Sequence, residues 1–373
     1  MGESPDMVPP MLSVIIIARN EEAHIAHCIE SIVAGSSGMR DCEVVLVDSR
    51  SEDRTVEIAS AYPIRIVELS EASRCCPALG RHVGSRSTRG RYVHFVDGDT
   101  TIDVGWLRAA VDVLERNSDV AGVGGREDQV YYREGTIIGT KADYFGTGER
   151  TSEVRQLGGN GLYRRAALEE VGSFNPYVRS FEEAELGARL RKAGWRLWRV
   201  PVLMGHHHTP KPEALDEYWR RFRSHLLTGQ GQVLRLSLGQ GLFLEHLAQL
   251  NRLVLFLGWV LIGVTAGIGS LALADYRVFA AWMIVSVLLL VAFAVRSRSI
   301  SKPFRLTMDW AISSIPFVWG FVLPVADPQG FRLEEAIASD RTADTRAPTV
   351  RASLAATAAP TAAPPLWVHR QDA

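Results

Sequence analysis

The stretch Arg91-Tyr-Val-His-Phe-Val-Asp-Gly-Asp-Thr100 decides how the rest of the chain is organised. Tyr92 to Val96 is apolar and rich in strand-favouring residues, which predicts a short buried strand. This strand ends at Asp97-Gly98-Asp99, where the glycine can adopt backbone angles that other residues resist. Two carboxylates therefore lie at the carboxyl end of a central strand, the edge at which open α/β sheets bind ligands. Such oxygens suit Mg²⁺ or Mn²⁺, although a polar Asp-Gly turn explains the same residues.

The composition narrows the class of protein. The 41 Lys and Arg nearly balance the 42 Asp and Glu, so no strong positive field indicates a nucleic-acid partner. The four cysteines show no C-x-x-C spacing for zinc, which favours reduced thiols in the cytosol. No signal peptide is recognisable, because the early apolar run is too short and lacks a cleavage site.

Apolar strands and amphipathic helices alternate from the first strand onward. Residues 12–18, 43–47 and 64–68 are β-branched runs, and residues 24–33 and 55–61 repeat apolar side chains at helical spacing. This alternation predicts a parallel sheet with crossover helices. Asn20 is a candidate helix cap. Further expected elements are a helix over 104–115, a strand over 120–124, an irregular substrate loop over 126–155, helices over 165–171 and 180–193, and a strand over 195–202.

Apolar residues concentrate in the last third of the chain. Leu253 to Ala274 and Val278 to Val295 are each long enough to span a bilayer as a helix. Residues 310–325 are shorter and contain Pro316, so this segment spans, tilts or lies in the interface. Because basic residues separate the second and third segments, the positive-inside rule places that loop in the cytoplasm. We therefore expect an arm at 1–10, a catalytic domain at 11–235, a membrane region at 236–335 and a disordered Ala/Pro/Thr-rich tail at 336–373.

Five blocks in order give the first 230 residues a resemblance to the family 2 glycosyltransferases of the GT-A fold, of the membrane-attached bacterial type. The blocks are SVIIIARNEE, VVLVDSRSEDRT, RYVHFVDGDT, LGGNGLYRRAALEEVGSF with SFEEAELGARLRKAGW, and the histidine run Gly205-His-His-His208. The resemblance implies a Rossmann-like mixed sheet flanked by helices, followed by transmembrane helices. It also implies a hexosyltransferase-like enzyme that inverts the anomeric carbon in a single displacement.

Site residues follow from the same resemblance, position by position. Those implied to bind the nucleotide-sugar donor are Ala18, Asn20, Glu21, Asp48, Asp53, Arg81, Asp97 and Gly159. The implied metal ligands are Asp97, Asp99 and His207, with His206 and His208 as alternatives to His207. The implied catalytic base is Glu183, with Glu182 as its neighbour in a Glu-Glu pair where the family more often has an Asp. These acids could instead form a solvated first helical turn, and Asp48 and Asp53 could merely cap the next helix.

The resulting prediction is a metal-dependent transferase for polysaccharide biosynthesis, multi-pass in the cell (inner) membrane with its catalytic domain in the cytoplasm. It would use Mg²⁺ or Mn²⁺ and a UDP-, GDP- or dTDP-linked sugar, and its acceptor would be a hydroxyl of a lipid-linked or membrane-associated glycan. Two alternatives are a polyprenyl-phosphate glycosyltransferase and an inactive sugar-nucleotide-binding membrane protein. A dinucleotide-binding oxidoreductase is disfavoured, since no G-x-G-x-x-G follows the first strand.

Overall fold

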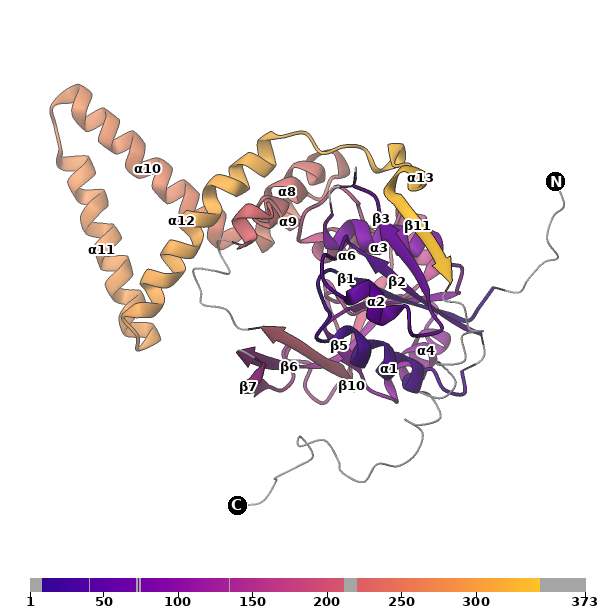
Figure 1. The fold of residues 1–373 in the computed structure, drawn as a ribbon. Helices are drawn as coiled ribbons and strands as arrows, with labels where there is room; N and C mark the ends of the chain where they lie inside the picture. Colours follow the sequence, from indigo (N-terminus) through magenta and orange to yellow (C-terminus); the bar gives the residue numbers. More distant parts are fainter. Residues whose placement is uncertain are drawn as a thin grey trace, which may run out of the picture.

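The structure, a computed structural model, describes residues 9–39, 41–71, 73, 75–133, 135–210 and 220–342. A mixed sheet flanked by helices forms the body, and a long helical hairpin projects from it (Figure 1). The strands are β1 (Leu12–Ala18), β2 (Cys42–Asp48), β3 (Arg65–Leu69), β4 (Tyr92–Asp97), β5 (Thr100–Ile102), β6 (Val120–Arg133), β7 (Thr136–Lys141), β8 (Ser152–Glu153), β9 (Leu162–Arg164), β10 (Arg196–Pro210) and β11 (Ile337–Thr342). The helices of the body are α1 (Ile25–Gly35), α2 (Thr55–Ala59), α3 (Pro77–Ser87), α4 (Trp106–Arg116), α5 (Arg165–Val171), α6 (Glu182–Lys192) and α13 (Leu333–Ala336). The remaining helices are η1 (Leu226–Thr228), α8 (Gly229–Gln240), α9 (Phe243–Gln249), α10 (Asn251–Leu273), α11 (Arg277–Ser297), α12 (Ser301–Val322) and η2 (Pro328–Gly330).

The sheet places β4 near its middle, in the order β11-β3-β2-β1-β4-β9-β6-β10-β5. Strands β3, β2, β1 and β4 run parallel, as the strand–helix alternation predicts. Their carboxyl ends therefore meet at one edge. The remaining pairs are antiparallel except β6 with β10, so the sheet is mixed.

Two apolar cores sandwich the sheet because successive strand residues point to opposite faces. On one face Val14 and Ile16 of β1 pack with α1 and α4. On the other face Ile15 and Ile17 pack with α3 and α6. Every residue of β1 is buried, which explains its unbroken apolar run.

The prediction of an irregular substrate loop over residues 126–155 is wrong for much of that range. Strand β6 continues to Arg133 and forms an antiparallel hairpin with β7. The histidine run likewise lies within β10 and does not follow a strand, because residues 205–210 pair with β6 and residues 205–207 also pair with β5. The buried carboxylate of Glu127 is tolerated in β6 because it accepts hydrogen bonds from Asn160 and Gln129.

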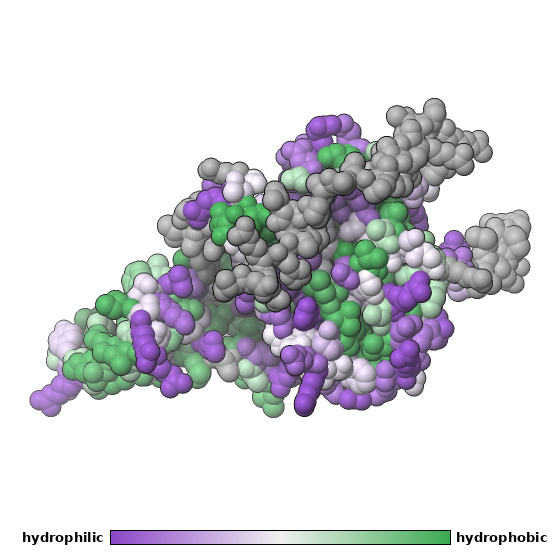
Figure 2. Space-filling model, turned by 90° about the horizontal axis from the view of Figure 1, so that it is seen from below, coloured by the Kyte–Doolittle hydropathy of each residue, from purple (hydrophilic) through white to green (hydrophobic). Residues whose placement is uncertain are grey.

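The α10–α11 hairpin matches the two expected membrane spans. Within the described residues, Arg252–Leu273 and Arg277–Ser297 are the helices long and apolar enough to cross a membrane. Their surfaces are largely exposed and hydrophobic, and green surface gathers over this part of the molecule, at the left of Figure 2. The third segment forms one helix, α12, which begins at Ser301 rather than at 310 and runs from the end of α11 back past the start of α10 to α8 (Figure 1).

The tail expected to be disordered from residue 336 is partly ordered. Strand β11 pairs antiparallel with the edge strand β3, and Asp340 accepts a 2.7 Å hydrogen bond from Nε of Arg65. Residues 343–373 lie outside the described residues, as do residues 1–8 of the expected arm. The catalytic body therefore includes a strand that follows the membrane region in the sequence.

Candidate active site

The Asp97–Asp99 loop lies where β4 ends, beside the end of β1. A Cβ on Gly98 would lie 2.9 Å from the Cβ of Ala18 and 3.1 Å from Cγ of Glu21, so only glycine fits this approach. Glu21 is thus held against the two aspartates. Burial, then the charges of Asp99 and Asp97, raises the pKa of Glu21 to about 8. The loop is therefore a concentrated site of negative charge, which a cation would relieve.

A second group of predicted residues braces the neighbouring loops. Asp48, buried at the end of β2, accepts hydrogen bonds from the backbone N–H and hydroxyl of Ser51. Asn20 is not a helix cap, because its left-handed backbone (φ 58°) turns the chain before α1 and its side chain accepts from Glu52 N–H. Asp53 accepts from the N–H groups of Glu22 and Thr55 and so ties both loops together.

Arg81 is buried within α3 and bridges two carboxylates. Its Nη2 donates to Asp97 at 2.8 Å and its Nη1 donates to Glu182 at 2.6 Å. The side chain of Arg81 is buried and each terminal nitrogen donates to a carboxylate, so the implied contact of Arg81 with the nucleotide-sugar donor stays a prediction. Gly159 completes the packing, because a Cβ there would lie 2.5 Å from Oδ2 of Asp97 and 2.6 Å from Nη2 of Arg81.

The two neighbouring glutamates of α6 have different environments. Phe181 adopts a left-handed backbone (φ 69°), which turns the chain into the helix just before them. Glu182 is buried on Arg81, and burial followed by the charge of Glu183 raises the pKa of Glu182 to about 8. Glu183 is only half-buried, and its charge contributes to the raised pKa of Asp97 after burial and Asp99. Glu183 is thus close enough to the aspartate loop for its charge to act on Asp97. Glu182 is buried on Arg81 and Glu185 on Arg189, so these two acids do not form a solvated first turn.

His207 reaches the same loop from β10. Its Nε2 lies 3.1 Å from the Asp99 carboxylate, and its Nδ1 lies 3.4 Å from Oε1 of Glu127. Burial disfavours its charge, but the bonds to these two carboxylates raise the pKa of His207 to about 11. His206 instead faces Asp128 at 3.9 Å, and His208 lies 3.2 Å from the Thr101 hydroxyl. Among the three histidines, His207 is therefore the one placed on the aspartate loop.

Sequence reasoning missed a buried polar network behind this loop. Asn160 accepts from the backbone N–H of Asp97 and donates to Glu127, both at 2.8 Å. Glu127 also accepts from Gln129, whose amide nitrogen lies 3.0 Å from Nδ1 of His207. The network fixes Asp97 and His207 relative to each other. Little in the sequence indicates this network. The charged run Arg126-Glu-Asp-Gln129 is typical of a loop, and Asn160 is a single amide between glycines.

The donor set fits a divalent ion that is shared with a substrate. No group of three or more His, Cys, Asp or Glu side chains within the described ranges could hold a metal by itself. Asp99 and His207 supply one oxygen and one nitrogen ligand side by side. Mg²⁺ usually keeps waters and takes one or two carboxylates plus substrate phosphates, so this partial set is what a diphosphate-bridging ion requires. Glu127 then orients the histidine from behind, as carboxylates commonly do for metal-bound imidazoles.

Comparisons with known proteins identify the family of the N-terminal part of the chain. Residues 13–172 match the family model described as Glycosyl transferase family 2. Glycosyltransferase AglE of Haloferax volcanii is 26% identical over 262 residues, covering 68% of this chain and 81% of that protein. Succinoglycan biosynthesis protein ExoA of Rhizobium meliloti is 24% identical over 304 residues, covering 75% and 88%.

A solved structure shares the fold. Mannosyltransferase PcManGT from Pyrobaculum calidifontis, solved in complex with GDP-Man and Mn²⁺, aligns with a TM-score of 0.54 at 18% identity, over 85% of this chain and 91% of that one. The expected GT-A fold is thereby confirmed. Residues 13–172 are a family 2 glycosyltransferase domain within a GT-A body, and the protein is a glycosyltransferase.

Proposed function

We propose that the protein moves a sugar from a nucleoside-diphosphate donor to a hydroxyl of a lipid-linked or membrane-associated glycan, with inversion at the anomeric carbon. The observation that carries this proposal is the 3.1 Å contact of His207, on β10, with Asp99 in the loop between β4 and β5, together with the charge of Glu183, at the start of α6, acting on Asp97 in the same loop. Such an arrangement suits an inverting displacement. Asp99 would lie on the side of the departing diphosphate, and Glu183 would lie on the side of the attacking hydroxyl.

The donor would lie along the carboxyl edge of β1, β2 and β4. The loops after Ala18 and Asp48 would hold the base and ribose, and their internal hydrogen bonds preorganise that surface. Asp97 would face the ribose or the metal with its carboxylate fixed by Arg81. Arg81 therefore acts by positioning, and its charge also prevents Asp97 and Glu182 from repelling each other at close range.

A divalent ion bound by Asp99, His207 and the donor diphosphate would neutralise the charge that develops on the leaving group. Glu127 and Gln129 would hold the imidazole so that Nε2 points to the ion. Because Nδ1 is engaged from behind, the ion would bind Nε2 in place of the proton that the neighbouring carboxylates otherwise keep on the ring. Mn²⁺ in the PcManGT complex supports this proposal through the shared fold.

Glu183 would accept the proton of the attacking hydroxyl. Glu182 is unsuited to this role because its carboxylate is buried on Arg81. Glu183 remains accessible at the start of α6, and a carboxylate there is stabilised by the helix dipole. Glu183 would then take the proton on the side of the sugar opposite the departing diphosphate.

The α10–α11 hairpin would hold the enzyme in the membrane with its catalytic body in the cytoplasm. Arg296, Arg298, Lys302 and Arg305 follow the second span, which places that end on the cytoplasmic side. An acceptor carried by a lipid would then meet the catalytic body at the bilayer surface. An acceptor that is itself a polyprenyl phosphate is the second candidate, and it would need no base.

Membranes containing the protein can test the proposal directly. Radiolabelled UDP-, GDP- and dTDP-sugars would be supplied in turn with Mn²⁺, and label in the lipid-linked fraction would be counted. We expect one donor class to label this fraction with the wild type and no labelling with Asp99→Ala. Equal labelling by the Asp99→Ala membranes would contradict the proposed metal site, and absence of transfer from every donor would contradict the proposed reaction.

A further inference from the structure

Two adjoining hollows lie where the helical hairpin meets the catalytic body. One has a volume of about 410 Å³ and is formed by α8, α9, α10 and α12. The other, of about 390 Å³, is formed by the start of α10, the end of α11 and the first half of α12. Arg252 and Trp310 line both hollows and so separate them. Each volume is within the range of small-molecule sites.

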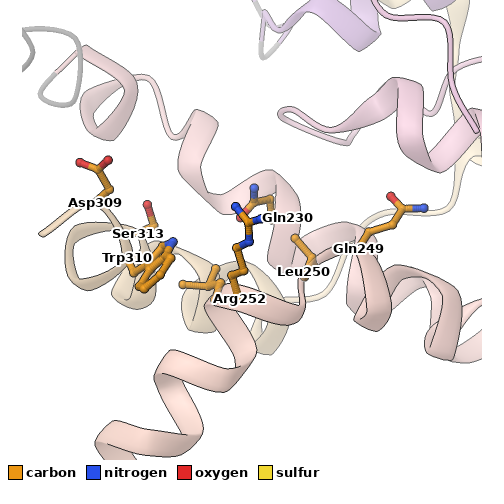
Figure 3. Close-up of a pocket in the computed structure, with 8 residues that line it drawn as sticks. Gln230, Gln249, Leu250, Arg252, Asp309, Trp310 and Ser313 are labelled. Atoms are coloured by element: carbon orange, nitrogen blue, oxygen red, sulfur yellow. The ribbon is translucent and has the colours of Figure 1, made fainter. Parts of the chain in front are cut away.

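The two hollows differ in chemistry. Gln230, Arg252 and Ser313 give the first one hydrogen-bond donors, and Figure 3 shows Arg252 extended toward Gln230 while Asp309 points away at the opposite end. The second hollow is lined by Phe293, Leu306 and Trp310, with Lys302 beside them. An anionic group therefore fits the first hollow and a hydrocarbon chain fits the second.

The cations at this site are available for a ligand. In the part of the chain that the structure describes, neither Arg252 nor Lys302 has an ion-pair partner, and both side chains are exposed. A guanidinium offers two parallel N–H groups that match the oxygens of a phosphate or of a carboxylate. The free charge thus favours an anionic ligand.

The surface beside the hollows indicates that this ligand is a lipid. Along α12, the exposed apolar side chains Phe304, Met308, Ile315, Val318 and Val322 recur at helical spacing. The opposite face of the helix, with Phe317 and Gly320, packs on α8. Such a helix suits the bilayer interface, between the two spans and the catalytic body. The apolar hollow consequently opens beside the expected hydrocarbon boundary.

A short path connects the hollows to the proposed base. Gln230 lines the first hollow, and its neighbour Gly229 packs so closely on Ser180 that a Cβ would collide with it. The Ser180 hydroxyl also donates to the backbone of Leu226. Because Ser180 comes just before Phe181 and the two glutamates of α6, one helix separates this hollow from the base-bearing segment.

We propose that these hollows bind the phosphate and the first hydrocarbon units of a lipid-linked acceptor. The phosphate lies on Arg252 at the boundary between the two hollows, with Lys302 beside it in the second, the chain lies along Phe293 and Leu306, and the glycan extends past α8 toward Glu183. This inference rests on the proposed transferase function and narrows its acceptor to a glycan on a lipid phosphate. It also assigns the phosphate to a place separate from the metal, so a sugar hydroxyl is the attacking group.

Radiolabelled farnesyl diphosphate is a suitable probe for binding to the purified full-length protein in detergent. The measurement is made in EDTA without nucleotide, so that the donor site contributes nothing. We expect Arg252→Gln to weaken binding by about tenfold to a hundredfold, the effect of losing a charge-assisted hydrogen bond. Lys302→Gln should act in the same direction. Arg277→Gln, at the far tip of the hairpin, is the matched control and should bind like the wild type.

Two further variants and competitors distinguish this site from the donor site and from general lipid binding. Asp99→Ala should bind farnesyl diphosphate normally, and Arg252→Gln should retain Mn²⁺-dependent nucleotide binding, which also shows that it is folded. Farnesol and phosphatidylglycerol should compete poorly. Wild-type binding by Arg252→Gln, loss of binding in Asp99→Ala, or equal competition by phosphatidylglycerol would overturn the proposal. Each result is independent of whether any sugar is transferred, so a failure of the proposed reaction is recognised separately.

Discussion

His207 and Asp99 are 108 residues apart in the sequence, yet Nε2 of His207 lies 3.1 Å from the Asp99 carboxylate. The contact forms because β10 runs antiparallel to β5 and carries the histidine past the end of the aspartate loop. Glu127 and Gln129 hold the other ring nitrogen, so the imidazole has little freedom to turn away. A carboxylate and an imidazole are thus held side by side, as the proposed metal site requires.

Replacing His207 should weaken metal use without unfolding the protein. We expect His207→Ala to raise the Mn²⁺ concentration needed for half-maximal transfer by at least about tenfold, in line with losses at metal sites. His206→Ala is the matched control, because His206 faces Asp128 at 3.9 Å and not the aspartate loop. A Mn²⁺ titration of transfer rates measures both. Identical titration curves for the two variants would show that His207 is not a ligand.

Arg81 should matter for stability as well as for activity. Arg81→Met removes the shared partner of Asp97 and Glu182 and leaves two carboxylates facing each other in a buried site. Breaking a buried ion pair in this way typically costs about 3–5 kcal/mol of unfolding free energy. Adding Glu182→Gln to Arg81→Met should recover part of the loss, because one buried charge is removed. Denaturant unfolding followed by tryptophan fluorescence measures this, and an undiminished wild-type stability in Arg81→Met would contradict the role.

His94 should make the fold sensitive to acid. It is buried in β4 with Trp106 Nε1 donating to its Nε2, and burial lowers the pKa of His94 to about 4. Since the folded pKa lies below the ordinary value of 6.5, this contribution to stability is present above pH 6.5 and is lost as the pH falls toward 4. The loss amounts to about 3 kcal/mol at 1.36 kcal/mol per pKa unit.

Unfolding measured from pH 7 to pH 4 tests this prediction. His94→Gln can keep the hydrogen bonds to Trp106 and to the backbone carbonyl of Gly161 without titrating, so its stability should fall less steeply in acid than that of the wild type. His27→Gln changes an exposed histidine and serves as the control. Parallel curves for wild type and His94→Gln would rule out the assigned effect.

Membrane attachment gives a simpler test. We expect the full-length protein to remain in the membrane fraction after high salt and alkaline washing, because α10 and α11 are long, apolar and exposed. Fractionation followed by immunoblotting measures this. A chain ending near residue 251 should be released but less stable, because it lacks α12, which packs on α8, and β11, which pairs with β3. Recovery of the full-length protein in the soluble fraction would contradict the two spans.

The sequence predicted the central strands well because their apolar runs end abruptly at Asp48 and at Asp97. It did not predict α3, whose Gly80 and Gly84 lower helix propensity. The structure explains Gly80, because a Cβ there would lie 2.8 Å from Ile17 of β1. Close packing on the sheet thus overrides local propensity.

The missed strands have a related explanation. Strand β11 is mostly exposed and carries no apolar alternation, so only its pairing with β3 reveals it. Strand β6 continues through charged residues because Glu127 is neutralised by tertiary hydrogen bonds from Asn160 and Gln129. Likewise, the sequence assigned the base to Glu183 only through the family resemblance, because the burial of Glu182 depends on the position of Arg81 from another helix.

The most direct test of the central claim, that Glu183 is the base opposite the Asp97–Asp99 loop, is to compare Glu183→Gln with Glu182→Gln. Glu183→Gln keeps the size of the side chain but removes the proton acceptor, and losses from such groups are roughly 10²–10⁴-fold in turnover. Turnover and nucleotide affinity would be measured together for both variants. The account predicts that Glu183→Gln loses turnover by this factor while it binds nucleotide like the wild type. Near-normal turnover of Glu183→Gln beside an inactive Glu182→Gln would contradict the assignment, and near-normal turnover of both would show that the acceptor needs no base.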